Sequence, residues 1–207
     1  MSSQDGSLTY VIVLAINYIM VVKTGVWSKM ETIHGMTNRT LNWIKSGPSK
    51  REFELRGETG VFGKLKWNKR FGSLATAMTN DGEWTLKRSG FLHPRVSARN
   101  AGSNKDIAVF KSGWTGTGTV EFETGLKLSW VNKNFLHSGW AFMGLDGGDI
   151  LRFQTKPGPL KINVQVTVLS DLPELPLLVC LGMYLLILIH EESAAVSTSM
   201  VPVTAST

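Results

Sequence analysis

Cysteine is nearly absent from this sequence, and no catalytic signature is visible in it. Cys180 is the only cysteine, which excludes an intramolecular disulfide framework and a cysteine-rich zinc site. There is no nucleophile elbow, no paired-histidine metal motif and no spaced pair of carboxylates. The glycine turn LDGGD (145–149) lacks the calcium-loop pattern, and GWTGTGT (113–119) lacks the GK[ST] ending of a phosphate loop. We therefore expect a non-enzymatic protein with no metal site and no cofactor.

Acidic residues are scarce in the middle of the chain. The net charge of the whole chain is +6, but between residues 43 and 169 lysine and arginine outnumber aspartate and glutamate by about two to one. Such an excess suits an anionic partner, which could be phospholipid headgroups, nucleic acid or an acidic protein. Composition does not choose among these three.

Long amphipathic helices are also missing from the central region, which argues against an α/β enzyme fold. Short segments separated by turn residues take their place, and alternation of apolar and polar residues is clear in EWTLKR (83–88) and LKINVQVTV (160–168). Eleven or so strands at this spacing predict a sandwich or barrel. The predicted strands are 52–56, 61–67, 73–79, 83–88, 93–99, 106–111, 118–123, 126–131, 139–145, 149–155 and 160–169.

The most apolar run, PELPLLVCLGMYLLILIHEE (173–192), follows these strands. A capping box at Asp171 to Glu174 and the prolines Pro173 and Pro176 predict a helix from about Leu175 to Ile189. Fifteen helical residues reach about 22 Å, which is short against a hydrocarbon core of about 30 Å. The run is apolar on every face, so lipid or protein must surround it. A barrel of about 12 strands is wide enough to need such a filling, so we predict a mainly β fold, a closed barrel around a buried apolar C-terminal helix.

The two ends of the chain are set apart from this domain. We assign residues 1–50 to an N-terminal apolar segment and linker, 51–192 to the barrel with its central helix, and 193–207 to a disordered tail. The apolar run from Leu8 to Val22 is a poor cleavable signal peptide, and is either a short anchor or an extension before a later start at Met30 or Met36. As an anchor, its flanking charges would favour a cytoplasmic body.

The order of the central motifs resembles a known family. TLKRSG (85–90), DIAVFK (106–111), ETGLKLSWV (123–131) and WAFMGLDGGDILRF (140–153) precede the apolar helix. This order resembles the tubby C-terminal-like superfamily, which includes phospholipid scramblases and plant LURP-one-related proteins. The resemblance implies a closed barrel that encircles the C-terminal helix. Scramblases carry a calcium-binding acidic segment and a cysteine cluster, which this chain lacks, so calcium-dependent activity is not implied.

Two basic groups are the candidate binding residues. KLKWNKR (64–70) supplies Lys64, Lys66, Lys69 and Arg70, and on a strand the first two lysines point away from Leu65 and Trp67. The second group is Lys87, Arg88, Arg95 and Arg99, which adjacent strands could bring together. For both groups a solvated strand face is the alternative to a binding site.

These features predict a cytoplasmic, membrane-associated scaffold or binding domain whose basic barrel surface meets anionic phospholipid. Two alternatives stay open: an integral membrane protein anchored by an apolar helix, and a basic β-barrel that binds nucleic acid. The sequence does not determine the oligomeric state.

Overall fold

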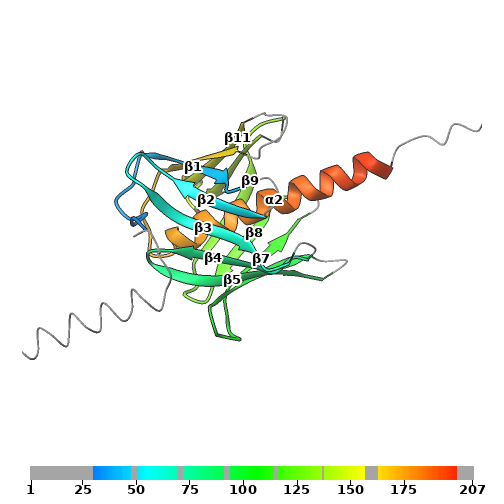
Figure 1. Ribbon diagram of the computed structural model, residues 1–207, viewed down its shortest axis with the longest axis horizontal. Helices are drawn as coiled ribbons and strands as arrows, with labels where there is room; N and C mark the ends of the chain where they lie inside the picture. Colours follow the sequence, from blue (N-terminus) through cyan, green and yellow to red (C-terminus); the bar gives the residue numbers. More distant parts are fainter. Residues whose placement is uncertain are drawn as a thin grey trace, which may run out of the picture. The chain divides into compact units, whose positions relative to one another are not determined.

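A computed structural model of the chain describes residues 30–47, 51–69, 72–90, 94–113, 116–136, 138–156 and 163–199. Within them, twelve antiparallel strands close into a barrel and one helix runs through it (Figure 1). The strands are β1 (Thr40–Lys45), β2 (Glu52–Arg56), β3 (Val61–Trp67), β4 (Ala75–Thr79), β5 (Gly82–Ser89), β6 (Arg95–Asn100), β7 (Asp106–Ser112), β8 (Gly118–Phe122), β9 (Lys127–Asn132), β10 (Gly139–Met143), β11 (Asp149–Lys156) and β12 (Asn163–Val168).

The strand order is a simple meander. Each strand pairs with its neighbours in the sequence, and β1 closes the ring by pairing antiparallel with β12, with Thr40 opposite Thr167 and Trp43 opposite Val164. Because every strand then has two partners, the barrel has no open edge.

The strands alternate as the sequence predicts. In β3 the side chains of Leu65 and Trp67 are buried, while Lys64 is half-buried and Lys66 is exposed. In β12 Val164, Val166 and Val168 are buried. Such alternation gives the barrel one apolar inner face and one polar outer face.

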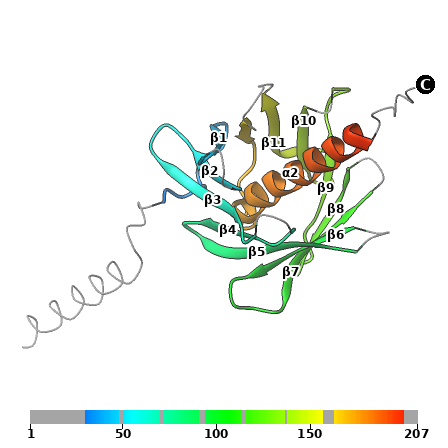
Figure 2. The ribbon, with the colours of Figure 1, turned by 45° about the vertical axis from the view of Figure 1, so that its right-hand side comes forward.

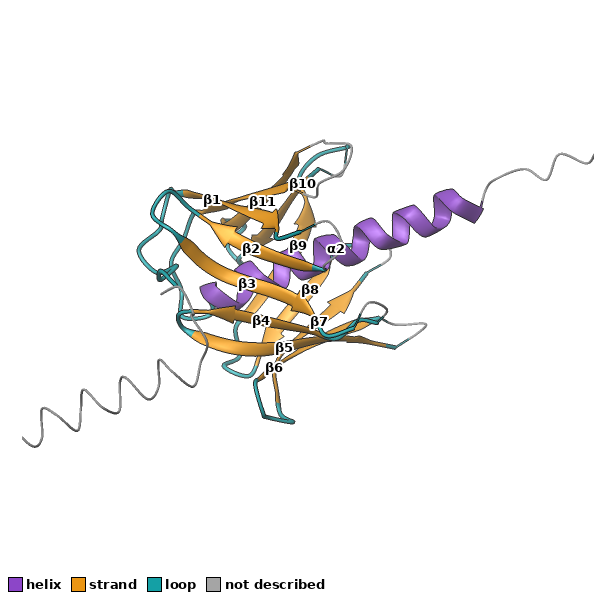
Figure 3. Cartoon of the chain, viewed as in Figure 1, coloured by secondary structure: helices purple, strands orange, loops and turns teal. Residues whose placement is uncertain are grey.

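The helix α2 (Leu175–Ser199) fills the barrel (Figures 2 and 3). Every residue from Leu175 to Ile187 is buried, and the helix then leaves the barrel with Glu191 and Glu192 exposed. Its segment Leu175–Ala194 is long and apolar enough to cross a membrane by length and composition, but 72% of that stretch is buried inside the protein. We call the rim where α2 begins the start rim, and the rim where it emerges the exit rim.

Aromatic rings join the helix to the barrel wall. The ring of Tyr184 on α2 stacks on Trp67 of β3 with centroids 5.4 Å apart. Trp130 of β9 stacks on Trp140 of β10 at 5.3 Å and meets Phe153 of β11 edge-on. Phe153 in turn packs against the helix backbone at Gly182, where a Cβ atom would lie 2.2 Å from its ring. The contact therefore requires glycine at this turn of the helix.

The structure confirms the fold class and corrects four details of the prediction. Residues 40–45 are not linker but strand β1, which is needed to close the barrel, so the domain begins before residue 51. The helix continues to Ser199 rather than ending near Ile189, so part of the expected tail is helical. The expected capping box is absent, because the Asp171 carboxylate is 2.7 Å from His34 Nδ1 and accepts the Gly35 amide at 3.0 Å.

The second basic group is not assembled as expected, because Arg88 points inward and Arg99 pairs with Asp106. The apolar run at 8–22 and the last eight residues of the expected tail lie outside the described residues.

Replacing Gly182 with alanine should destabilise the protein by about 1 kcal/mol. Alanine improves helix propensity by about 1 kcal/mol, but overpacking against Phe153 typically costs about 1–3 kcal/mol. Urea unfolding followed by tryptophan fluorescence measures the difference. Ser193→Ala on the exposed part of α2 is the control, and a Gly182→Ala protein as stable as the wild type would contradict this packing.

Candidate anion-binding surface at the exit rim

The two rims carry opposite charge. In the described connections at the start rim, carboxylates outnumber cations; they are Glu31, Glu58, Asp81, Glu123, Asp146, Asp171 and Glu174, against Arg39 and Lys105. The described connections at the exit rim carry Arg51, Lys69 and Lys133, and no carboxylate. Among the described residues, the carboxylates near this rim are those of Glu52, the first residue of β2, and of Glu191 and Glu192 on α2.

The first predicted basic group divides between paired and unpaired cations. Lys64 forms an ion pair with Glu54 at 3.3 Å on the outer face. Lys66 lies opposite Glu52 on β2 but forms no ion pair with any described residue, and Lys69 is exposed and likewise without a carboxylate partner. Arg70 lies outside the described residues.

The second predicted group is not brought together. Arg99 pairs with Asp106 at 2.5 Å near the start-rim end of β6. Arg88 is two residues after Leu86 and four after Trp84, so it lies on the same inner face of β5 and points toward the helix. Only Lys87 and Arg95 remain exposed on the outer face near the exit rim. The side-chain alternation of β5 is the physical reason, because neighbours on a strand face opposite sides.

Four predicted residues therefore stay without a carboxylate partner among the described residues, and we call them the exit-side cations: Lys66, Lys69, Lys87 and Arg95. All four lie toward the exit rim, at the ends of β3, β5 and β6. A further cation, Lys111 of β7, lies directly opposite Arg95 in the pairing of β6 with β7. Its ammonium is 3.8 Å from the Glu121 carboxylate, which is a long ion pair. Like charges in facing positions disfavour folding unless an anion screens them.

An apolar pair accompanies these cations at the same rim. Phe135 and Leu136 lie in the β9–β10 connection and are 95% and 81% exposed. Lys133, in the same connection, is held away from the rim by Asp149, which it meets at 3.0 Å beside Arg152 at 2.6 Å. Burial would raise the pKa of Asp149, but the hydrogen bonds from Arg152 and Lys133 lower it below its usual value.

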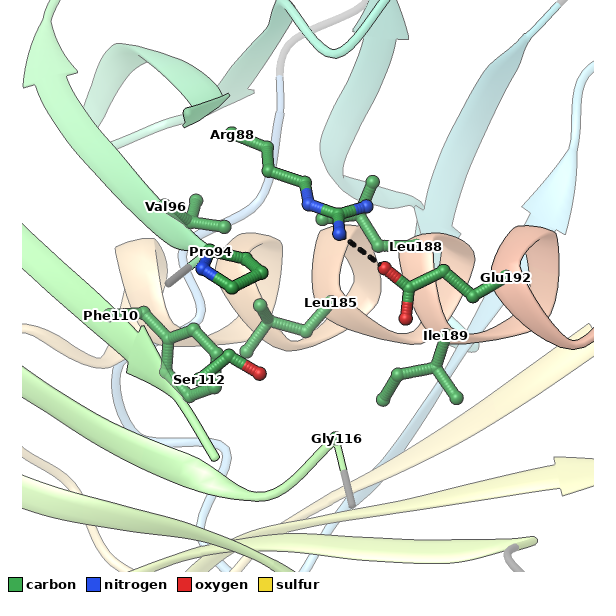
Figure 4. Close-up of a pocket in the computed structure, with 10 residues that line it drawn as sticks. All are labelled: Arg88, Pro94, Val96, Phe110, Ser112, Gly116, Leu185, Leu188, Ile189 and Glu192. Atoms are coloured by element: carbon green, nitrogen blue, oxygen red, sulfur yellow. Dashed lines mark ion pairs between the residues drawn. The ribbon is translucent and has the colours of Figure 1, made fainter. Parts of the chain in front are cut away.

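Arginines and helix carboxylates meet where α2 emerges. Arg51 pairs with Glu191, and its guanidinium lies 4.7 Å from the centre of the Trp67 ring. Arg88 pairs with Glu192 at 2.5 Å (Figure 4). Arg51 was not among the predicted binding residues, because no dense run of lysine and arginine surrounds it in the sequence.

A small cavity of about 30 Å³ lies beside the Arg88 pair, which is room for about two waters. Its wall combines Val96 and Phe110 of the barrel with Leu185, Leu188 and Ile189 of the helix (Figure 4). This volume is too small for a lipid chain without movement of the helix.

The remaining polar groups can be compared with the motifs considered in the sequence. No group of three His, Cys, Asp or Glu side chains in the described part of the chain could hold a metal ion. LDGGD forms the tight turn between β10 and β11, with Gly147 at φ 82°. His93 and His137 lie outside the described residues. Comparison of the chain with protein-family models, curated proteins and solved structures finds no match.

The buried thiol and phenol of α2 predict a loss of stability in alkali. Burial raises the pKa of Cys180 from 9.0 to about 12 and that of Tyr184 from 10.0 to about 12. The unfolded chain therefore releases these protons at lower pH than the folded chain. Their contribution to stability is complete below about pH 9 and falls as the pH rises toward 12.

Free energies of unfolding measured from pH 8 upward would show this slope. We expect Cys180→Ala to flatten it from about pH 9 and Tyr184→Phe to flatten it from about pH 10. The surface lysines are the same in both variants and in the wild type, so their titration does not contribute to the difference in slope. Unchanged slopes in both would show that neither group is buried.

Proposed function

We propose that this protein associates peripherally with anionic phospholipid through the exit rim and the adjoining outer face of β3, β5 and β6. The observation that supports it is that the exit-side cations gather at one rim, without carboxylate partners among the described residues. The opposite rim carries mainly carboxylates. A barrel polarised in this way orients itself toward a negative surface before contact.

The exposed pair Phe135 and Leu136 favours a membrane over nucleic acid as the anionic partner. Each cation near an anionic membrane contributes about 1 kcal/mol, and apolar side chains at the same rim can enter the headgroup region.

Burial of α2 argues for peripheral rather than integral association. The stretch of the helix that is apolar enough to span a bilayer already has the barrel around it. Exposing it to lipid would leave the inner faces of all twelve strands without a core. Protein soluble only in detergent would favour the integral alternative.

Vesicle flotation tests the proposal with a charge-matched pair of variants. Full-length K66Q/K69Q/K87Q/R95Q should lose at least about tenfold in partitioning to vesicles of phosphatidylcholine with phosphatidylglycerol. The control, R39Q/R56Q/K105Q/K127Q, removes the same number of charges near the start rim and should float like the wild type.

Three results would contradict the proposal. One is a wild type that does not float with anionic vesicles at low salt, and another is equal loss in both variants. The third is salt-sensitive retardation of duplex DNA by protein that ignores vesicles, which would favour nucleic-acid binding.

A further inference from the structure

Two arginines at the exit rim pair with glutamates of the helix, and the guanidinium of Arg51 also contacts the barrel. Arg51 lies over Trp67, donates to the Gly72 carbonyl at 3.2 Å and pairs with Glu191. The ring and the carbonyl both belong to the barrel. The orientation of this arginine therefore does not depend on the glutamate alone.

The backbone of Arg88 is held in place by hydrogen bonds, while its guanidinium pairs with Glu192. Its amide donates to the Tyr184 hydroxyl at 3.1 Å, and its carbonyl accepts the Ser73 hydroxyl at 3.0 Å. Tyr184 also donates to the Ser73 carbonyl. Since Gly72 and Ser73 are consecutive, the same short connection supports both arginines. Both also lower the pKa of Tyr184, against the larger effect of burial, so both act on one phenol.

The carboxylates are held less firmly than the arginines. The side chains of Glu191 and Glu192 are 47% and 54% exposed, against 23% and 31% for Arg51 and Arg88. They follow the buried part of α2, on the segment that has left the barrel. Exposed ion pairs of this kind are weak, and an arginine fork fits a phosphate as well as a carboxylate.

We propose that Arg51 and Arg88 form a binding site for a phosphate group, on a lipid headgroup or free, and that Glu191 and Glu192 occupy it as internal competitors. An arriving phosphate displaces both carboxylates, which turn into solvent on the exposed segment of α2. The site is distinct from the exit-side cations, for which the described part of the chain offers no carboxylate partner. Only its use of lipid phosphate rests on the proposed function above.

Titration with sodium phosphate tests the site without a membrane. The Nε–Hε NMR signals of Arg51 and Arg88 in the full-length chain should shift with phosphate, and not with sodium chloride at matched ionic strength. In E191Q/E192Q the affinity should rise by about tenfold, since two weak ion pairs no longer compete.

The variant E58Q/E123Q is the matched control, because it removes two exposed carboxylates at the start rim. It should bind phosphate like the wild type. The proposal is overturned if neither arginine responds to phosphate in E191Q/E192Q, if that variant binds no more tightly than the wild type, or if the control gains as much.

Flotation then identifies the source of the phosphate. Better flotation of E191Q/E192Q than of E58Q/E123Q with anionic vesicles assigns the site to lipid, and equal flotation assigns it to free phosphate. If the Arg51 and Arg88 signals shift with phosphate but the wild type does not float with anionic vesicles, the phosphate site is supported and the proposed membrane association is contradicted. If the wild type floats but the arginine signals do not shift with phosphate, the membrane association is supported and the phosphate site is contradicted.

Discussion

Enclosure of the apolar helix α2 is the constraint on which the rest of the structure depends. A helix that is apolar on every face has no side to offer to water, so it must be surrounded. Residues Leu175 to Ile187 are all buried, and rings such as Trp67 and Phe153 reach them from the wall. The barrel without the helix would be hollow, and the helix without the barrel would be insoluble.

A helix threaded through a barrel makes its two rims different. At the start rim, Asp171 meets His34 and Glu174 accepts the Thr124 hydroxyl, so the incoming chain is held by carboxylates. At the exit rim, the outgoing chain is held by arginines from the barrel. Among the described residues the two rims therefore differ both in charge and in the way they hold the chain that leads into and out of the helix.

Ion pairing decides which of the many cations could meet a partner. Lys64 and Arg99 are matched by Glu54 and Asp106 on neighbouring strands, and Arg88 by the helix. What remains at the exit rim is a small set of cations with an exposed apolar pair. The net charge of the chain says little about this set, because it counts matched and unmatched cations alike.

The alternating strands and the enclosed helix could be predicted from the sequence, because apolar spacing along the chain is a local property that dictates which side chains leave water. The parity of EWTLKR, with Trp84 and Leu86 inward, could also have placed Arg88 inward. Strand β1 was missed although TLNWIK alternates and its partner β2 follows closely in the sequence; only its pairing with the distant β12, which closes the ring, is a long-range contact. Only the tertiary structure decided the pairing of charges and the grouping of the exit-side cations. Both depend on strand register and on closure of the ring, which bring together residues far apart in the chain.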